Sequence, residues 1–192
     1  MTQVTAYTNE GRYKCLEDLP IDSAELSLGY CGWEQCYPGH RFGPNKRAYY
    51  ALHIIANGKG KLEKNGEVFH LTTGDAFLLC PEEEAWYEAD KKEPWAYAWI
   101  GLYGYKVKKV MQYAGFSKEK SVRSLKCTAL LKLYVDEILE VHRLTTEESM
   151  RRNGYLNLFL ATLIEDNEKF NTKTTPEHTY PGTVYVEHAM EY

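Results

Sequence analysis

The sequence predicts a chain that is mainly β in its first half and helical toward its C-terminus, an α+β domain built on a sandwich or barrel of short strands. Short runs rich in β-branched and aromatic residues alternate with glycine-containing turns as far as residue 102. Beyond Gly101 the apolar residues recur at helical spacing instead. The chain has 192 residues, of which 44% are hydrophobic and 26% are charged. This composition is typical of a globular protein, and the length suits one domain with appended elements.

The clearest turn signal joins the runs 61–64 and 67–70. Asn65-Gly66 stands between them, and this dipeptide favours a hairpin because both turn residues must adopt positive φ. A further strand over 76–80 stops at Pro81. These signals predict antiparallel strands connected by tight turns.

The run 95–102 alternates between large and small side chains. Trp95, Tyr97 and Trp99 fall on one face of the predicted strand, and Ala96 and Ala98 fall on the other. The pattern therefore predicts a strand that presents three aromatic rings to one side.

Three helices are predicted after the strands, over about 107–114, over about 122–142 and from Thr145 onward. The second and third are amphipathic and adjacent, which predicts an antiparallel helical hairpin. They carry more apolar positions than one buried stripe requires, so we expect a homodimer, although such a stripe can also pack on the helix's own domain. The spacing in the second helix matches a coiled-coil seam. The predicted dimer-interface residues are Cys127, Leu131, Tyr134, Ile138, Val141, Leu156, Leu160 and Leu163.

The two ends of the chain are polar. Residues 1–25 predict an arm with one short strand near its end, because they show little periodicity. Residues 171–182 predict a proline-containing linker, and 183–192 begin an amphipathic helix too short to be stable alone. We therefore expect the sequence to end at a domain boundary.

Charge and cysteine content exclude several classes of protein. The net charge of −4 has the wrong sign for a surface that neutralises phosphates, so this segment alone is not expected to bind DNA. The N-terminus lacks the apolar core of a signal peptide, and no apolar run approaches the about 20 residues of a membrane span. Five scattered cysteines fit reduced thiols. We expect a cytoplasmic protein that does not contact a membrane.

Six short motifs follow one another in a fixed order. They are Gly32–Cys36, Pro38–His40, Arg47–His53, Gly58–Gly60, Leu71–Leu79 and Pro94–Gly101. This ordered set, followed by two helices and a linker, resembles the regulatory domains of the AraC/XylS family of transcription regulators found in many Gram-positive bacteria, and the resemblance covers nearly the whole chain.

The resemblance implies a domain layout. Residues 26–102 would form a cupin-like jelly-roll barrel that binds a small effector, often a sugar, and 103–170 would form the helical dimerisation region. Residues 171–192 would be the linker and the start of a DNA-binding domain. The two helix-turn-helix units that bind DNA in this family are absent from the sequence, so DNA would be bound only through that absent domain.

The resemblance also implies ligand contacts. Tyr97 and Trp99 match family positions that close one wall of the effector site, and Tyr87 aligns with another contact. Aromatic rings cover the apolar faces of sugars, but large rings also serve to fill a barrel interior.

Residue chemistry adds further candidates. The Arg47 guanidinium could donate paired hydrogen bonds to hydroxyls, or lie at the surface. His53 shares a strand face with Tyr49, although a lone histidine is more often a core or rim residue. Glu34 suits hydroxyl binding, and the alternative is a carboxylate at a solvent-facing edge. The complete predicted ligand-binding set is Tyr97, Trp99, Tyr87, Trp95, Arg47, Tyr49, His53, Trp33 and Glu34.

Catalysis and cofactors are not expected. Cupin enzymes usually hold a metal through a His-x-His pair and further ligands, and the six histidines here form no such pair. The place of the second motif's histidine is taken by Glu84-Ala85-Trp86-Tyr87. No nucleophile elbow, Walker loop or dinucleotide fingerprint is present. The alternative is a metal-free cupin enzyme acting on a carbohydrate, which an acid-base pair of Glu34 with His53 would support.

Overall fold

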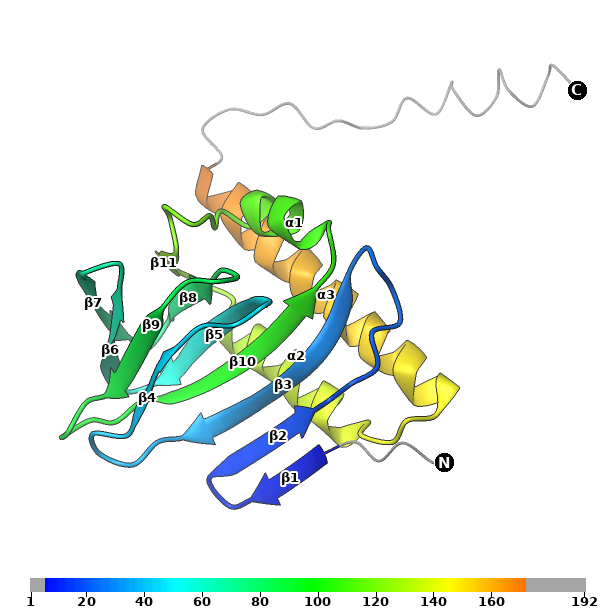
Figure 1. The fold of residues 1–192 in the computed structure, drawn as a ribbon, viewed down its shortest axis with the longest axis horizontal. Coiled ribbons are helices and arrows are strands. Elements are labelled where there is room, and N and C mark those ends of the chain that lie inside the picture. The colour runs from blue at the N-terminus through cyan, green and yellow to red at the C-terminus, as the bar shows by residue number, and fades with distance from the viewer. Residues whose placement is uncertain (1–5, 172–192) are drawn as a thin grey trace, which may run out of the picture.

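A computed structural model describes residues 6–171 (Figure 1). The predicted fold class, mainly β with C-terminal helices, is confirmed in this part of the chain. The linker and helix start predicted at 171–192 lie, except for Asn171, outside the described residues. The elements are β1 (Ala6–Glu10), β2 (Tyr13–Glu17), β3 (Ser27–Gln35), β4 (Arg41–Asn45), β5 (Tyr50–Asn57), β6 (Lys59–Lys64), β7 (Glu67–Thr72), β8 (Asp75–Leu79), β9 (Ala85–Ala89), β10 (Ala96–Tyr103), α1 (Val107–Tyr113), β11 (Val122–Ser124), α2 (Thr128–Glu140) and α3 (Thr146–Asn171).

The strands pair into two antiparallel sheets, as in double-sheet jelly rolls. The larger sheet has the order β1-β2-β3-β10-β5-β8-β11, and the smaller has the order β4-β9-β6-β7. The predicted hairpin is present as β6 and β7, and its turn residues Asn65 and Gly66 have φ angles of 54° and 79°. The positive φ that Asn-Gly tolerates is the reason this turn could be predicted from two residues.

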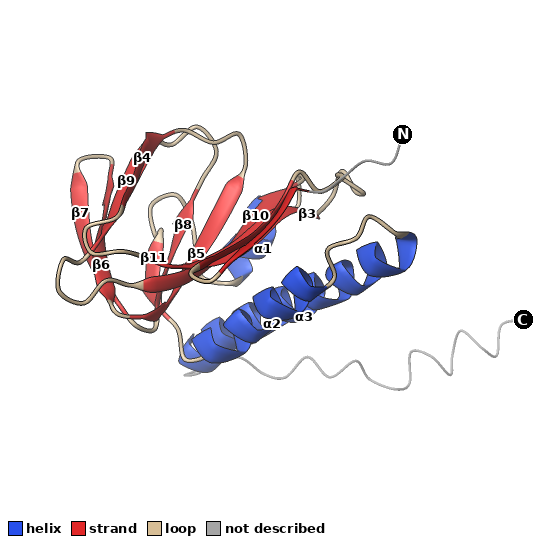
Figure 2. Ribbon diagram, turned by 90° about the horizontal axis from the view of Figure 1, so that it is seen from below, coloured by secondary structure: helices blue, strands red, loops and turns tan. Residues whose placement is uncertain are grey.

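Two separate cores lie on the two faces of the larger sheet. On β10, Tyr97 and Trp99 belong to the core between the sheets, whereas Ala98 and Ile100 belong to the core beneath the helices. The alternation predicted for this strand is therefore confirmed. Figure 2 shows α2 and α3 lying across one face of the larger sheet, with the smaller sheet on the other side.

The N-terminal segment is more ordered than its polar composition indicated. β1 and β2 form a hairpin that extends the larger sheet, with Tyr13 paired to Glu34 and Leu16 paired to Cys31 of β3. Cys15 and Leu16 are buried. The prediction of an arm with one short strand missed this hairpin, because only two of its residues are fully buried.

The helical region departs from prediction at one point. Val122–Ser124 is a strand that pairs with β8, so α2 begins at Thr128 and not near residue 122. The antiparallel packing of α2 and α3 is as predicted: Tyr155 Oη donates to Glu137 Oε2 at one end, and the Lys126 amide donates to Asp166 Oδ1 at the other. None of the helices within residues 6–171 has the length and apolar content needed to span a membrane.

The predicted dimer seam packs largely inside the chain itself. Leu131, Ile138, Leu156, Leu160 and Leu163 are at most 4% exposed and belong to the core between helices and sheet. Cys127 and Tyr134 pack against the same core. These five buried side chains cannot contact a partner subunit, because they already pack between the helices and the larger sheet. Among the side chains of α2 and α3 whose burial the structure describes, the large apolar ones that are exposed are instead Leu130, Leu133, Met150 and Leu158.

Candidate ligand-binding site

A cavity of about 590 Å³ opens between the two sheets. This volume lies within the range of small-molecule sites. Seven residues of the predicted ligand-binding set line it, and they come from β3, β5, β9, β10 and the segment before β5. They are Glu34, Arg47, Tyr49, His53, Tyr87, Tyr97 and Trp99.

Two predicted residues lie elsewhere. Trp33 faces the helices, where Lys132 Nζ lies 5.0 Å from the centre of its ring. Neighbouring residues of a strand point to opposite faces, so Trp33 and Glu34 cannot share a cavity, and the prediction for Trp33 was wrong on this point. Trp95 is fully buried beside the cavity, with its ring against Phe77 and Tyr97, and acts as filler.

The aromatic wall is centred on Trp99. Its ring centre lies 5.5 Å from that of Tyr97 and 5.8 Å from that of Tyr13. Gly32 pairs with Trp99 across β3 and β10, and a Cβ atom at Gly32 would collide with the indole. The absence of a side chain at Gly32 therefore lets the indole lie across β3.

One polar contact joins neighbouring strands of the larger sheet, and a second joins the two sheets. Tyr97 Oη donates to Glu34 Oε2 over 3.2 Å, and Tyr87 Oη lies 3.3 Å from His53 Nε2. The His53 ring stacks on Phe77 with the ring centres 4.4 Å apart. The acid-base pair that the enzyme alternative needs is not present as a direct contact, because Glu34 and His53 are held by different tyrosines.

Burial keeps three groups of the cavity wall, His53, Tyr87 and Tyr97, uncharged. Desolvation, together with the charge of Arg47, holds the pKa of His53 well below its ordinary value of 6.5. Desolvation raises the pKa of Tyr87 to about 12 and that of Tyr97 well above its ordinary range. At neutral pH these groups are an uncharged imidazole and two phenols, which suit hydrogen bonding to a ligand better than proton transfer.

Two polar atoms of the wall have no hydrogen-bond partner among residues 6–171. They are Tyr30 Oη and His53 Nδ1, both buried. Buried polar atoms in proteins are normally paired, so these two lack the partner that such atoms usually have.

Sequence reasoning missed several lining residues. Tyr30 shares the inward face of β3 with Gly32 and Glu34, so period-2 spacing counted back from Glu34 could have found it. Tyr13 and Asp18 also line the cavity, but their segment carried no periodic signal.

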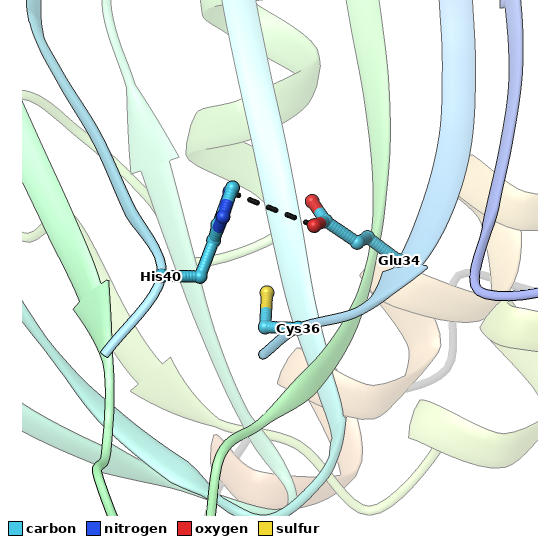
Figure 3. Close-up of side chains that lie close together, drawn as sticks. All are labelled: Glu34, Cys36 and His40. Carbon is cyan, nitrogen blue, oxygen red and sulfur yellow. Dashed lines mark ion pairs between the residues drawn. The ribbon is translucent and has the colours of Figure 1, made fainter. Parts of the chain in front are cut away.

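The cavity itself does not fit a metal ion of the cupin type. His53 is the histidine that lines it, and the neighbouring Arg47, Tyr87 and Tyr97 do not make a divalent-cation donor set. Among the described residues, one group of three potential ligands occurs, Glu34, Cys36 and His40, of which Glu34 also lines the cavity (Figure 3).

Two facing sheets that enclose a cavity walled by aromatic rings, phenols and carboxylates define a small-molecule-binding domain. A family model described as "AraC-like ligand binding domain" matches residues 27–150. The chain belongs to this family. The resemblance seen in the sequence motifs is thereby confirmed.

The chain is also similar to three curated regulators. It is 33% identical over 150 residues to the Msm operon regulatory protein of Streptococcus mutans, covering 78% of this chain and 54% of that protein. It is 37% identical over 94 residues to the raffinose operon transcriptional regulatory protein RafR of Pediococcus pentosaceus, covering 48% and 33%. It is 34% identical over 89 residues to the lactose operon transcription activator of Staphylococcus xylosus, covering 46% and 31%. The chain thus spans between about a third and about half of these relatives' lengths.

Among solved structures, a cupin protein from Bacteroides fragilis aligns with a TM-score of 0.37 at 15% identity, over 51% of this chain and 85% of that one.

Proposed function

We propose that this chain is the effector-sensing domain of a sugar-responsive transcription regulator of the AraC family, and that an uncharged sugar binds in the cavity between the sheets. The observation that carries the proposal is the composition of that cavity. Rings of Tyr13, Tyr97 and Trp99 stand beside unpaired polar atoms of Tyr30 and His53. This combination matches a ligand with apolar faces and hydroxyl edges.

The charges of the cavity favour a neutral ligand over an acid. Glu17, Asp18 and Glu34 line it together with the single guanidinium of Arg47. Carboxylates accept hydrogen bonds from hydroxyl groups, but they repel a ligand that is itself a carboxylate or phosphate.

The names of the relatives support the same class of effector. Two of them are regulators of a raffinose operon and a lactose operon. We therefore place di- and trisaccharides first among the compounds to test.

The partners follow from this proposal. DNA would be bound by a domain outside this sequence, and the domain described here would act in the cytoplasm as a homodimer without catalysing a reaction. The exposed leucines Leu130, Leu133 and Leu158 support a dimer contact on α2 and α3, because they lie on the helices and outside the chain's own core. A dimer contact through these leucines would involve other residues than the predicted seam, but it would still lie on the predicted helices.

The test is titration calorimetry of the full chain with galactose, lactose and raffinose, with galacturonate as the charged comparison. We expect one of the neutral sugars to bind and galacturonate not to bind. Trp99→Phe should weaken the sugar's affinity roughly tenfold, because the smaller ring covers less of the ligand. Trp33→Phe is the matched control, since Trp33 lies on the opposite face of the same sheet.

The proposal fails if none of the neutral sugars binds, or if Trp33→Phe weakens binding as much as Trp99→Phe. In the second case the sugar would lie outside the cavity between the sheets.

A further inference from the structure

A carboxylate, a thiol and an imidazole converge where β3 ends. The ligand atoms of Glu34, Cys36 and His40 all lie within 4.8 Å of one another. His40 Nε2 is 3.5 Å from Glu34 Oε1. Figure 3 shows the imidazole and the carboxylate facing each other, with the Cys36 sulfur pointing into the same space.

Local chain geometry produces this convergence. Glu34 and Cys36 are two residues apart at the end of an extended strand, so their side chains leave the same face. A turn then brings His40 back, with the His40 amide donating to Tyr37 O over 3.0 Å. The Ala89 amide donates to His40 O over 2.9 Å, which attaches this turn to the smaller sheet.

Neighbouring groups hold the backbone of Cys36 and the carboxylate of Glu34 in place. The Cys36 amide donates to Trp95 O over 3.1 Å, and Cys36 O accepts from Arg12 Nη2 over 2.8 Å. Tyr97 Oη donates to Glu34 Oε2, which leaves Oε1 directed at His40. Metal ligands in proteins are typically oriented by such outer hydrogen bonds.

We propose that Glu34, Cys36 and His40 form a binding site for a divalent cation of the zinc class. Thiolate, imidazole and carboxylate are all zinc ligands, whereas Ca²⁺ and Mg²⁺ require oxygen ligands throughout. Three protein ligands leave the fourth tetrahedral position to a water molecule or to an oxygen of a bound compound. This site does not use the His-x-His pair of cupin enzymes, which the sequence lacks. The proposal also does not depend on the proposed sugar binding.

The distances are compatible with closure around an ion. Ligand atoms of a tetrahedral zinc site lie about 3.5 Å apart, given bonds of about 2.0–2.3 Å. The His40 side chain is 37% exposed, so it can move the remaining distance, while the buried Cys36 stays fixed. Burial raises the pKa of Cys36 to about 12, so binding of the ion must displace the thiol proton into solvent.

A simple ion pair accounts for the cluster less well. The separation of 3.5 Å between His40 and Glu34 is longer than the about 2.8 Å of a charge-assisted hydrogen bond. A buried thiol pointing at the pair adds little to an ion pair, but it is a strong ligand for zinc.

The test measures Zn²⁺ affinity of the full chain by competition with a chromogenic chelator, and the absorption spectrum of the Co²⁺ form. We expect one equivalent of Zn²⁺ and a thiolate-to-cobalt charge-transfer band. His40→Gln removes one ligand and should weaken Zn²⁺ binding by about 100-fold. Removing a residue that only orients a ligand already lowers metal affinity by about 10–100-fold. His70→Gln, at an exposed position on β7, is the matched control and should bind as the unaltered chain does.

A second pair of variants assigns the thiol. Cys36→Ser should abolish the charge-transfer band, while Cys127→Ser should retain it. The proposal is overturned if no thiolate band forms, or if His40→Gln binds Zn²⁺ as tightly as His70→Gln does. The histidine pair decides the matter even if Cys36→Ser fails to fold, because His40 is partly exposed.

Discussion

The two faces of the seven-stranded sheet are made by alternate residues of the same strands, yet they differ in chemistry. Leu52, Ile54 and Ile100 face the helices and are fully buried among aliphatic side chains. His53 and Trp99, their immediate neighbours in sequence, face the smaller sheet and border a cavity. One face is closely packed with aliphatic side chains, and the other combines an aromatic core with a cavity that has polar groups in its wall. The aliphatic core and the proposed ligand site therefore lie on opposite sides of one sheet.

The two faces also differ in the unpaired polar atoms that they bury. Each aliphatic side chain buried on the helical face contributes about 1.5–3 kcal/mol to folding. A buried polar atom without a partner, such as Tyr30 Oη on the cavity side, costs about 1–3 kcal/mol until a ligand pairs with it. The aliphatic core on the helical face therefore offsets the cost of such unpaired atoms.

The largest effect is expected from a change on the helical face. Leu131 of α2 is fully buried in that core, so Leu131→Ala should lower the free energy of unfolding by about 2–5 kcal/mol. Urea denaturation measures this loss. Met150→Ala, at an exposed position of α3, is the control and should cost far less. Equal losses in the two variants would contradict the placement of α2 on the sheet.

An intermediate effect is expected on the cavity face, through pH. The pKa of His53 is lower in the folded chain than its ordinary value of 6.5, because burial disfavours the imidazolium. Below pH 6.5 the unfolded chain therefore binds more protons than the folded chain. Stability should fall as the pH drops through that value, by up to about 1.4 kcal/mol per pH unit from this group.

Denaturation curves of His53→Gln between about pH 5 and pH 8 check this expectation. The variant should lose that part of the pH dependence, whereas His70→Gln should keep it. An unchanged slope in His53→Gln would show that the imidazole is not held neutral between the sheets.

The smallest effect is expected at the margin of the helical face. Lys132 Nζ lies 5.0 Å from the Trp33 ring and 2.6 Å from Asp136 Oδ1, and its side chain is 26% exposed. Lys132→Gln should lower the free energy of unfolding by about 0.5–1 kcal/mol, since partly exposed cation contacts contribute little. If Lys132→Gln lowered the free energy of unfolding as much as Leu131→Ala does, the margin of the helical face would be as important for stability as its buried centre, which would contradict this comparison.

Much of the strand pattern could be predicted because its signals are local. Asn65-Gly66 determines a turn through the φ angles of two residues, and the alternation around Tyr97 and Trp99 follows from strand geometry. The same alternation should have separated Trp33 from Glu34, and applied to Tyr30 it would have added a cavity residue.

Other features depended on long-range contacts. Val122–Ser124 has too few residues to show a period, and it becomes a strand only because β8 offers a free edge. The apolar stripe of α2 is equally compatible with a partner subunit and with the chain's own sheet, and the choice follows from what lies within reach after folding.

The sequence by itself determined the change from strands to helices after Gly101, the hairpin turn and the aromatic face of β10, because each depends on residues within a few positions of one another. Only the tertiary structure decided that the N-terminal hairpin joins the sheet, that Glu34 meets both Tyr97 and His40, and that most of the predicted seam is buried. These outcomes depend on side chains that are distant in sequence or that pack against distant strands, and burial of shared apolar surface brings them together.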